Sequence, residues 1–225
     1  MKPIQVNDLH KTYLQGRLST KVLKGLSFSL DEGEFVSLVG PSGSGKTTLL
    51  HVLGGFEDYD GSVELFGKEL KTYTETEKAR MRAHDIGFVF QFYNLIPNLT
   101  AYENILLASV LGKHKTKDDI MAVLAMVGME AFAHYHPGRL SGGMQQRVAI
   151  ARCLINEPRI IFADEPTGNL DYKNGLAIMD LFKTLNIEHK KTILMVSHNE
   201  ETTRYGTRVL HLLDGKVIKD ERLAI

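Results

Sequence analysis

The chain has 225 residues, a length that buries a substantial core in one domain or in one domain with a satellite. Its 27 basic and 27 acidic side chains cancel, so bulk charge favours neither nucleic acid nor an anionic membrane as a partner, although net charge does not report local patches. Hydrophobic residues make up 43% of the chain and charged residues 24%, which is ordinary for a globular protein.

The single cysteine, Cys153, excludes an internal disulfide and fits a reducing compartment. Its mostly apolar neighbours predict a thiol packed on a helix, not a nucleophile. The first residues lack the apolar segment of a signal peptide, and apolar runs such as 105–111 are far shorter than a membrane-spanning helix. We therefore expect a chain that does not itself cross a bilayer.

The first quarter of the chain is predicted to run from strands into a glycine-rich loop and a helix. Residues 3–30 have the composition of strands, and 31–34 form a turn. Residues 35–39 form a short apolar strand that leads into the glycine-rich loop 40–48. The pattern from Thr47 onward predicts a helix that ends at Gly54-Gly55.

The middle of the chain is predicted to contain one strand and then a long helical block. Asp60-Gly61 lies between strand-like runs, which predicts a hairpin with a tight turn, and Asp214-Gly215 predicts another near the end of the chain. Residues 86–90 form a strand that ends at Gln91, and the pattern from there to about 157 is helical. The spacing of Thr100 and Glu103 matches a capping box, which predicts a helix start at this point.

The last third returns to an alternation of buried strands with a helix. Residues 159–163 and 192–196 have the continuous apolar composition of buried strands. Between them, an amphipathic helix is predicted from apolar residues at every third position, namely Leu176, Met179, Phe182 and Leu185. This order predicts an α/β fold with a mostly parallel sheet, into which residues 92–157 insert a helical subdomain.

The loop at 40–48 has the sequence of a nucleoside triphosphate-binding loop. Gly40, Gly43 and Gly45 allow backbone N–H groups to converge on phosphate oxygens, where the following helix presents its positive end. Lys46 would neutralise the β- and γ-phosphates, and Thr47 would offer its hydroxyl to Mg²⁺. A chance match is the alternative, but the strand before the loop and the helix after it are the context that the motif requires. The residues expected at the nucleotide are Gly40, Pro41, Ser42, Gly43, Ser44, Gly45, Lys46, Thr47 and Thr48.

Two carboxylates, Asp164 and Glu165, follow the buried strand 160–163. Open α/β sheets bind ligands at this end of their strands. Asp164 would hold Mg²⁺, largely through water, and Glu165 would polarise the attacking water. Without the phosphate loop, an acidic turn that leaves a strand would be the better interpretation.

The segment Ser141-Gly142-Gly143 predicts a helix N-terminus with uncovered amides, which is a second anion site. The alternative is a capping serine followed by two flexible glycines. Because one triphosphate already has its loop at 40–48, a second phosphate contact requires another ligand or another copy of the chain.

With these motifs in this order, the chain resembles the nucleotide-binding subunit of an ATP-binding cassette (ABC) transporter over nearly all of its length, and residues 140–145 are similar to the signature motif of that family. The resemblance implies a P-loop NTPase core with a mostly parallel sheet, an N-terminal antiparallel β subdomain and an inserted α-helical subdomain. It implies a single domain over 1–225, with the catalytic core and β subdomain at 1–91 and 158–225 and the helical subdomain at 92–157.

The resemblance also implies a site shared between two copies that pack head to tail. Each ATP with its Mg²⁺ would lie between the phosphate loop of one copy and Ser141, Gly142 and Gly143 of the other. ATP would close this homodimer, and hydrolysis with product release would reopen it. The implied metal contacts are Thr47, Gln91 and Asp164, largely through water.

The resemblance assigns further single residues. Tyr13 matches the aromatic that stacks on adenine, Gln91 the glutamine that contacts Mg²⁺ and senses the membrane partner, and His198 the histidine that holds the γ-phosphate. The implied catalytic group is therefore Glu165 with His198 and Gln91, and residues 168–171 match the loop that crosses the dimer interface. Each has a plain alternative by itself: a surface strand residue for Tyr13, a strand terminus for Gln91, a satisfied histidine for His198 and, for Asp171, a helix N-cap.

Residues 95–104 and 163–171 are most similar to the lipoprotein-release, macrolide-export and cell-division ATPases within the family. The implied function is an ATPase that drives a separate transmembrane permease from the cytoplasmic face of the inner membrane, with membrane contact only through that permease. Met144 departs from the glutamine or glutamate of many relatives but leaves the Ser-Gly-Gly contacts intact. The substrate is not readable from this chain.

Two other functions use the same motifs. One is a regulator of a transmembrane cell-division or cell-wall complex, which the residues do not distinguish from a transporter. The other is an ABC ATPase that acts on nucleic acid. The absence of heptads and of a broad basic composition argues against it, so no nucleic-acid partner is expected.

Overall fold

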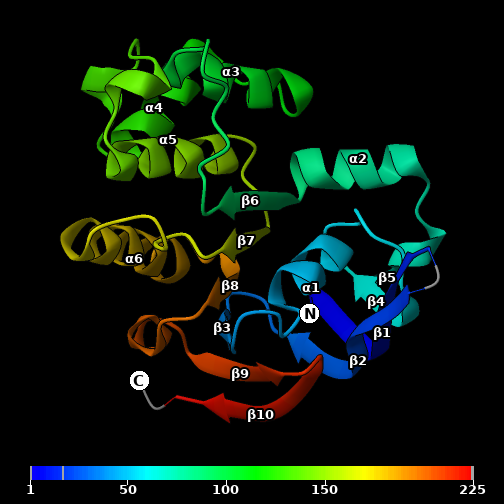
Figure 1. Ribbon diagram of the computed structural model, residues 1–225. Helices are drawn as coiled ribbons and strands as arrows, with labels where there is room; N and C mark the ends of the chain where they lie inside the picture. The colour runs from blue at the N-terminus through cyan, green and yellow to red at the C-terminus, as the bar shows by residue number, and fades with distance from the viewer. Residues whose placement is uncertain (1, 17, 224–225) are drawn as a thin grey trace.

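The computed structural model describes residues 2–16 and 18–223, and within them a six-stranded sheet organises the chain (Figure 1). Its order is β10-β9-β3-β8-β7-β6. Strands β9, β3, β8, β7 and β6 are parallel to their neighbours, and β10 joins β9 antiparallel. The strands are β3 (Phe35–Val39), β6 (Ile86–Phe90), β7 (Ile160–Asp164), β8 (Thr192–Ser197), β9 (Arg208–Leu213) and β10 (Lys216–Arg222).

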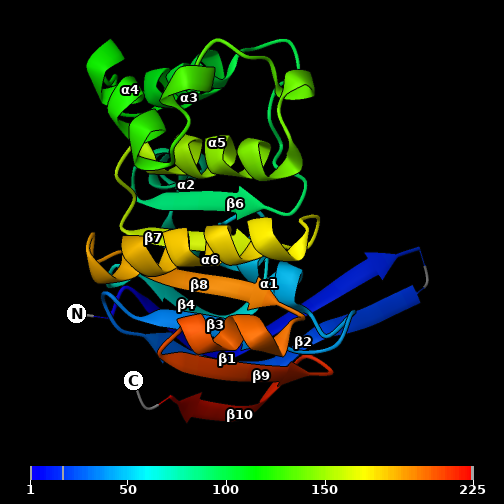
Figure 2. The same ribbon diagram turned by 90° about the vertical axis from the view of Figure 1, so that its left-hand side faces the viewer.

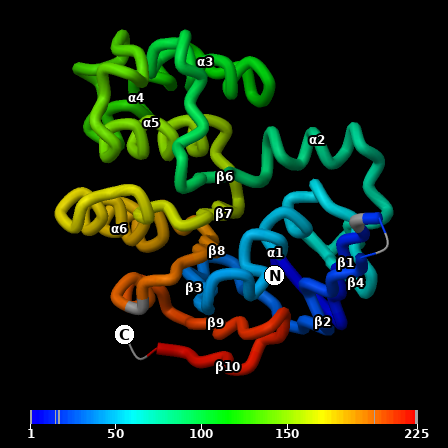
Figure 3. Tube along the Cα trace, in the orientation of Figure 1, coloured from blue at the N-terminus to red at the C-terminus, as the bar shows by residue number. Residues whose placement is uncertain are grey.

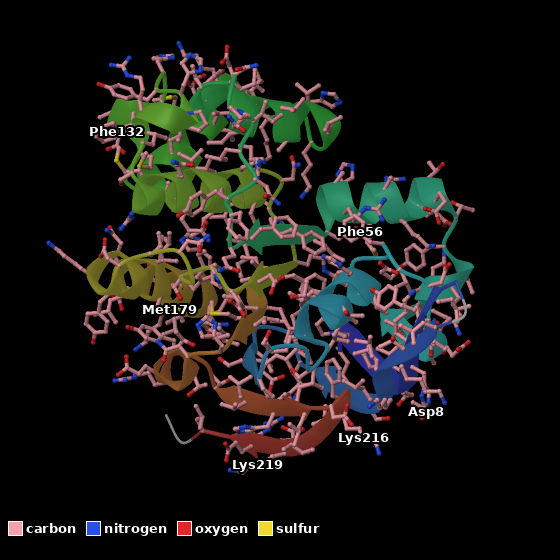
Figure 4. All side chains as sticks on the ribbon, viewed as in Figure 1. Asp8, Phe56, Phe132, Met179, Lys216 and Lys219 are labelled. Atoms are coloured by element: carbon pink, nitrogen blue, oxygen red, sulfur yellow. The ribbon has the colours of Figure 1, made fainter. Side chains whose placement is uncertain are left out.

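The central strands are buried on both faces, which explains their continuous apolar sequence. Successive side chains point to opposite faces of a strand, so each strand feeds two cores. In β8, Leu194 and Val196 join the core that surrounds α1 (Lys46–Leu53), whereas Ile193 and Met195 join the core beneath α6 (Tyr172–Ile187). Figure 4 labels Met179 on α6, which is buried in this second core.

A second, antiparallel sheet covers α1 from the other side. It is formed by β1 (Ile4–Gln15), β2 (Leu18–Leu30), β4 (Asp60–Leu65) and β5 (Lys68–Glu69), in the order β2-β1-β4-β5. The 3₁₀ turn η1 (Leu70–Thr72) follows it. The far ends of β1 and β2 project from the body as an arm (Figure 2). The first core is therefore a layer of apolar side chains between the two sheets and α1.

The helical block stands at the β6 edge of the large sheet, and the chain enters it from β6 and returns through β7 (Figure 3). It contains α3 (Ala101–Leu111), α4 (Lys117–Met126), η2 (Glu130–Phe132), η3 (Pro137–Arg139) and α5 (Gly142–Leu154). The remaining elements are α2 (Glu75–His84), beside β6, and the 3₁₀ helix η4 (Glu200–Tyr205), which precedes β9. In the described part of the chain, no helix is both long and apolar enough to cross a membrane.

The expected fold class is confirmed: a mixed, mostly parallel sheet, an antiparallel N-terminal sheet and an inserted helical block. The helix start at Thr100 is also confirmed, since Thr100 and Glu103 form a complete capping box. Asp214-Gly215 forms the turn between β9 and β10, with both residues at left-handed φ angles of 46° and 73°.

Two expectations about local structure need correction. Asp60-Gly61 does not form a hairpin turn: it begins β4, and the hairpin turn lies at Phe66-Gly67, between β4 and β5. A Cβ atom at Gly61 would lie 2.1 Å from the carbonyl oxygen of Asp8, so this glycine permits close strand pairing with β1. Helix α2 was not predicted, because Met81 is its one buried residue and gives no apolar stripe.

Candidate nucleotide site

The glycine-rich loop joins β3 to α1 and has the backbone of an anion-binding loop. Gly43 and Gly45 have left-handed φ angles of 76° and 101°, which side chains other than glycine rarely adopt. A Cβ atom at Gly40 would lie 2.1 Å from the carbonyl oxygen of Leu212 on β9, so glycine is required there for a close approach. Gly45 caps α1, whose N-terminal amides therefore face the loop.

Lys46 is buried at the centre of this loop. Its ammonium donates to the carbonyl oxygens of Gly40 and Pro41 at 2.8 and 2.9 Å, which folds the side chain back across the loop. Burial lowers the pKa of Lys46, and the nearby carboxylates of Glu165 and Asp164 act against that shift. The ammonium group of Lys46 thus lies at the base of the loop.

Two acidic residues reach the loop from the end of β7. The hydroxyl of Thr47 donates to Asp164 Oδ1 at 3.2 Å, which joins the first turn of α1 to the strand end. Burial raises the pKa of Asp164, and the neighbouring Glu165 adds to the rise, while the Thr47 hydrogen bond lowers it. A partly buried carboxylate of this kind favours a cation beside it.

Glu165 lies in a cavity of about 330 Å³ that the phosphate loop lines. Its backbone is left-handed, with φ of 46°, a conformation that costs free energy in a residue other than glycine. Its carboxylate Oε2 lies 3.0 Å from Nδ1 of His198, which follows β8. The lining residues are Val22, Ser42, Gly43, Gly45, Lys46, Thr47, Thr48 and Glu165.

Gln91 lies at the end of β6 and is bound to the loop that follows β7. Its side-chain Nε2 donates to Asn169 Oδ1 at 3.2 Å, and Asn169 Nδ2 donates to the carbonyl oxygen of Gln91 at 3.0 Å. A Cβ atom at Gly168 would lie 2.8 Å from Gln91 Nε2, so the two segments are in close contact. Gln91 follows β6 and Lys46 follows β3, so two strands, β8 and β7, lie between them, and both residues are at the carboxyl end of the parallel strands.

Ser141, Gly142 and Gly143 do not line the cavity that holds the phosphate loop. Ser141 is the N-cap of α5, and its hydroxyl accepts from the Met144 amide at 3.3 Å. At Gly142 a Cβ atom would lie 2.7 Å from the Tyr93 hydroxyl, and at Gly143 a Cβ atom would lie 2.7 Å from Asn174 Oδ1. The segment is thus a capped helix start that contacts Tyr93 and Asn174 of its own chain and lies outside the cavity of its own phosphate loop.

Tyr13 also lies outside that cavity, on the projecting arm formed by β1 and β2. The ammonium of Lys11 lies 4.8 Å from the centre of the Tyr13 ring and forms an ion pair with Glu57 at 2.8 Å. The ring itself is 37% exposed. One face of Tyr13 is thus backed by a cation, and the side chain retains surface for a ligand.

The structure brings the loop residues, Asp164, Glu165 and His198 together, and it places Gln91 beside the same sheet edge. Sequence reasoning missed three contacts: Val22 in the cavity, Asn169 on Gln91, and Arg152 on the loop after β6. Asn169 had been noted only as part of the interface loop. Val22 and Arg152 occur in segments that read as an ordinary strand and helix, so no local signal pointed to them.

The loop, the acidic strand end and the capped Ser-Gly-Gly helix occur within a single family model. Residues 23–168 match the model described as "ABC transporter". The chain belongs to the ABC transporter family. Members of this kind are ATPases, and this chain is an ABC ATPase domain.

Curated relatives of this ABC domain fall into two lengths. A protein of Chlorobium phaeobacteroides named macrolide export ATP-binding/permease protein MacB is 42% identical over 100% of this chain and 35% of its own length. The chain thus spans about a third of that relative. An uncharacterized ABC transporter ATP-binding protein of Thermotoga maritima is 44% identical, over 100% of this chain and 97% of its own length.

Solved structures agree with this placement. The cassette MJ0796, whose sequence comes from Methanocaldococcus jannaschii, was solved as a dimer in a post-hydrolysis state bound to ADP and Pi. It is 41% identical to this chain, with a TM-score of 0.91, over 98% of this chain and 99% of the other. A cbiO1 structure from Clostridium perfringens is 26% identical, with a TM-score of 0.87, over 98% of this chain and 88% of the other.

Proposed function

We propose that this ABC domain hydrolyses ATP as one of two copies that energise a transmembrane permease, by the mechanical mode implied by its likeness to the lipoprotein-release and macrolide-export ATPases. The observation that carries the proposal is the cavity of about 330 Å³ in which the phosphate loop meets Glu165. It combines a positive charge, a helix N-terminus and a carboxylate that is hydrogen-bonded to a histidine.

The loop residues 40–48 bind the phosphates of ATP in this proposal. Backbone N–H groups of a loop with left-handed glycines converge on anionic oxygens, and Lys46 exchanges its two carbonyl partners for the β- and γ-phosphates. Tyr13 stacks on adenine with the Lys11 cation behind its ring. His198 contacts the γ-phosphate.

The residues at the end of β7 fit Mg²⁺. Within the described residues, no group of three or more histidine, cysteine, aspartate or glutamate side chains could hold a metal alone. Mg²⁺ typically keeps waters and uses one or two protein ligands together with substrate phosphates. Thr47 and Asp164, joined at 3.2 Å, match that need, with Gln91 nearby at the sheet edge. When bound, the ion neutralises charge that develops on the phosphates.

Glu165 accepts the proton of the attacking water. Its carboxylate is oriented by His198 at 3.0 Å and by a left-handed backbone that points the side chain into the cavity. A base must lie within hydrogen-bond reach of the proton that it abstracts, and a fixed orientation lowers the entropic cost of reaching that geometry. Gln91 helps to hold the water and the metal ligands at the sheet edge.

The second half of each site comes from another copy of the chain. Ser141, Gly142 and Gly143 lie outside their own cavity, so they can contact a γ-phosphate only across an interface. The dimeric state of the solved relatives supports this arrangement. Residues 168–171 lie between Gln91 and α6, where we place the crossing between copies.

We further propose residues 1–91 and 158–225 as the catalytic core with its β subdomain, and residues 92–157 as the helical subdomain. The permease is a separate membrane-spanning partner, and through it the ATPase is held at the cytoplasmic face of the inner membrane. The permease named together with the ATP-binding part in the MacB relatives supports this partner.

The test uses Glu165→Gln and Lys46→Ala. Glu165→Gln is expected to bind ATP with unchanged affinity, to accumulate as an ATP-dependent dimer in gel filtration and to lose at least about a hundredfold in hydrolysis rate. Lys46→Ala is expected to lose ATP binding itself, measured by equilibrium titration. A hydrolysis rate in Glu165→Gln equal to that of the unmodified chain would refute the general-base assignment.

A further inference from the structure

The loop after β6 has an unusual backbone that its own sequence explains only in part. Tyr93 and Asn94 are consecutive and both left-handed, with φ angles of 61° and 50°. Neither is a glycine; asparagine adopts this region more readily than other residues, so the steric cost that surrounding contacts must offset falls mainly on Tyr93. The loop begins at Gln91, which the proposed function places at the metal and the attacking water.

Arg152 holds this strained pair. From α5, its Nη2 donates to the carbonyl oxygen of Tyr93 at 2.9 Å and its Nη1 donates to the carbonyl oxygen of Asn94 at 2.5 Å. Burial lowers the pKa of Arg152, and no ion pair joins it to a carboxylate among the described side chains. The planar guanidinium therefore donates hydrogen bonds to two adjacent carbonyl groups, a geometry that a lysine cannot match.

The same helix contacts the loop at its other end. Gly142 lies in the first turn of α5, and a Cβ atom there would lie 2.7 Å from the Tyr93 hydroxyl. Gln146, one turn later, is fully buried, and its side-chain nitrogen and oxygen have no hydrogen-bond partner among the described residues. Helix α5 therefore contacts the loop at two places, through Arg152 and through its first turn.

The loop is fixed to the sheet as well. Gln91 and Asn169 exchange two hydrogen bonds, at 3.0 and 3.2 Å, across the ends of β6 and β7. A single residue, Phe92, therefore separates Gln91, which is bonded to the sheet, from Tyr93, which is bonded to α5. A displacement of α5 relative to the sheet has to be absorbed within this short segment.

We propose that Arg152 is a positioning residue for hydrolysis, because it ties the loop that carries Gln91 to the helix that begins with Ser141. The inference rests on the role proposed above for Gln91. Arg152 touches neither nucleotide nor metal; it acts by holding Tyr93 and Asn94 so that Gln91 stays in register with α5. In a shared site, Gln91 of one copy and Ser141 of the same copy serve different ATP molecules, so this tie links the two sites.

The alternative is that Arg152 only stabilises the fold, and the chain offers a matched control. Arg147 lies on the same helix, is partly buried and donates from Nη1 to the carbonyl oxygen of Val127 at 2.9 Å, at the end of α4. It holds a backbone carbonyl within the helical block, away from the loop after β6. Arg147→Met therefore removes a comparable structural bond without touching the tie.

The experiment measures ATP hydrolysis, ATP affinity and the denaturation midpoint for Arg152→Lys, Arg152→Met and Arg147→Met. We expect Arg152→Lys to lower kcat by about tenfold, and Arg152→Met by more, with ATP affinity within about twofold, because a small misplacement of a reacting group costs up to about a hundredfold in rate. Arg147→Met is expected to lower the midpoint but to keep kcat. An unchanged kcat in Arg152→Lys, or equal losses of kcat in Arg147→Met and Arg152→Lys, would overturn the inference.

A double variant separates this inference from the function on which it rests. If Arg152 acts through Gln91, Gln91→Ala with Arg152→Lys hydrolyses ATP no more slowly than Gln91→Ala alone, within about twofold. A further tenfold loss in the double variant overturns the inference and leaves the role of Gln91 intact. A normal rate in Gln91→Ala alone refutes the proposed role of Gln91, whatever the Arg152 variants do.

Discussion

At the scale of single residues, the site is organised by charges that have been taken out of water. Lys46 is buried against carbonyl oxygens, and Asp164 is partly buried with a raised pKa. Among the described residues neither group forms an ion pair: Lys46 bonds to carbonyl oxygens and Asp164 to a hydroxyl. Such a site gains most when a ligand supplies both an anion for Lys46 and a cation for Asp164, which is what ATP with Mg²⁺ provides.

Cys153 gives a prediction that depends on pH. Burial raises the pKa of its thiol to about 12, from an ordinary value of 9.0. At pH 9 the folded chain therefore holds the neutral thiol, while the unfolded chain is about half thiolate, the form that reacts. We expect iodoacetamide to label Cys153 at pH 9 at least about a hundredfold more slowly in the folded chain than in guanidinium.

The sign of the accompanying stability effect follows from the same shift. Because the folded-state pKa is raised, the contribution of the neutral thiol to stability is complete below pH 9 and is lost as the pH rises toward 12.

The rate of iodoacetamide labelling is measured by mass spectrometry, which reports on Cys153 alone because the chain has one cysteine. Equal labelling rates for folded and unfolded chain would contradict the raised pKa of this thiol.

At the scale of elements, capping boxes define where the helices begin. Thr74 with Glu77, Thr100 with Glu103, and Thr116 with Asp119 each show both reciprocal hydrogen bonds. The first of these marks α2, the helix that hydrophobic periodicity did not predict. Its Thr-Glu spacing was present in the sequence, so the capping signal was more informative there than the apolar pattern.

The cap of α3 can be tested directly. Thr100→Ala removes the side-chain acceptor for the Glu103 amide and leaves the reciprocal bond from the Thr100 amide to Glu103. We expect the free energy of unfolding to fall by about 1 kcal/mol, measured by chemical denaturation. Thr100→Ser keeps the hydroxyl and serves as the control. A loss as large in Thr100→Ser as in Thr100→Ala would argue that packing of the threonine methyl matters, not the cap.

At the scale of the whole molecule, the two halves of the proposed site are separated from each other within one chain. The phosphate loop follows a central strand of the large sheet, whereas Ser141 begins a helix of the block beyond the β6 edge (Figure 1). This separation predicts that variants with complementary defects rescue each other in a mixed dimer. Such rescue has no counterpart in an enzyme with a complete site in each chain.

The rescue is measured in chains that carry Glu165→Gln, so that ATP-dependent dimers accumulate. Lys46→Ala removes one half of the site and Gly143→Arg the other, because Gly143 lies against Asn174 and has no room for a side chain. Each variant alone is expected to stay monomeric with ATP. Their mixture retains one intact composite site, and we expect it to form an ATP-dependent heterodimer in gel filtration that neither variant forms alone. A mixture that stays as monomeric as its parts would count against the shared site.

The sequence by itself determined the fold class, the family and the order of the motifs. These follow from local rules: continuous apolar strands are buried on both faces, glycines permit left-handed loops, and Thr-Glu spacing caps helices. The exception, Asp60-Gly61, shows the limit of such rules. There the same dipeptide begins a strand, because Gly61 packs closely against β1. A Cβ atom at Gly61 would lie 2.1 Å from the carbonyl oxygen of Asp8 on that strand.

Only the tertiary structure decided which of these residues meet. Glu165 and His198 are 33 positions apart, Gln91 and Asn169 are 78 apart, and Arg152 reaches Tyr93 over 59. Parallel strands bring the first two pairs together because their carboxyl ends share one edge of the sheet. The contact of Arg152 depends on how α5 packs against β6, and the sequence of an amphipathic helix does not encode which distant carbonyl groups its arginine will meet.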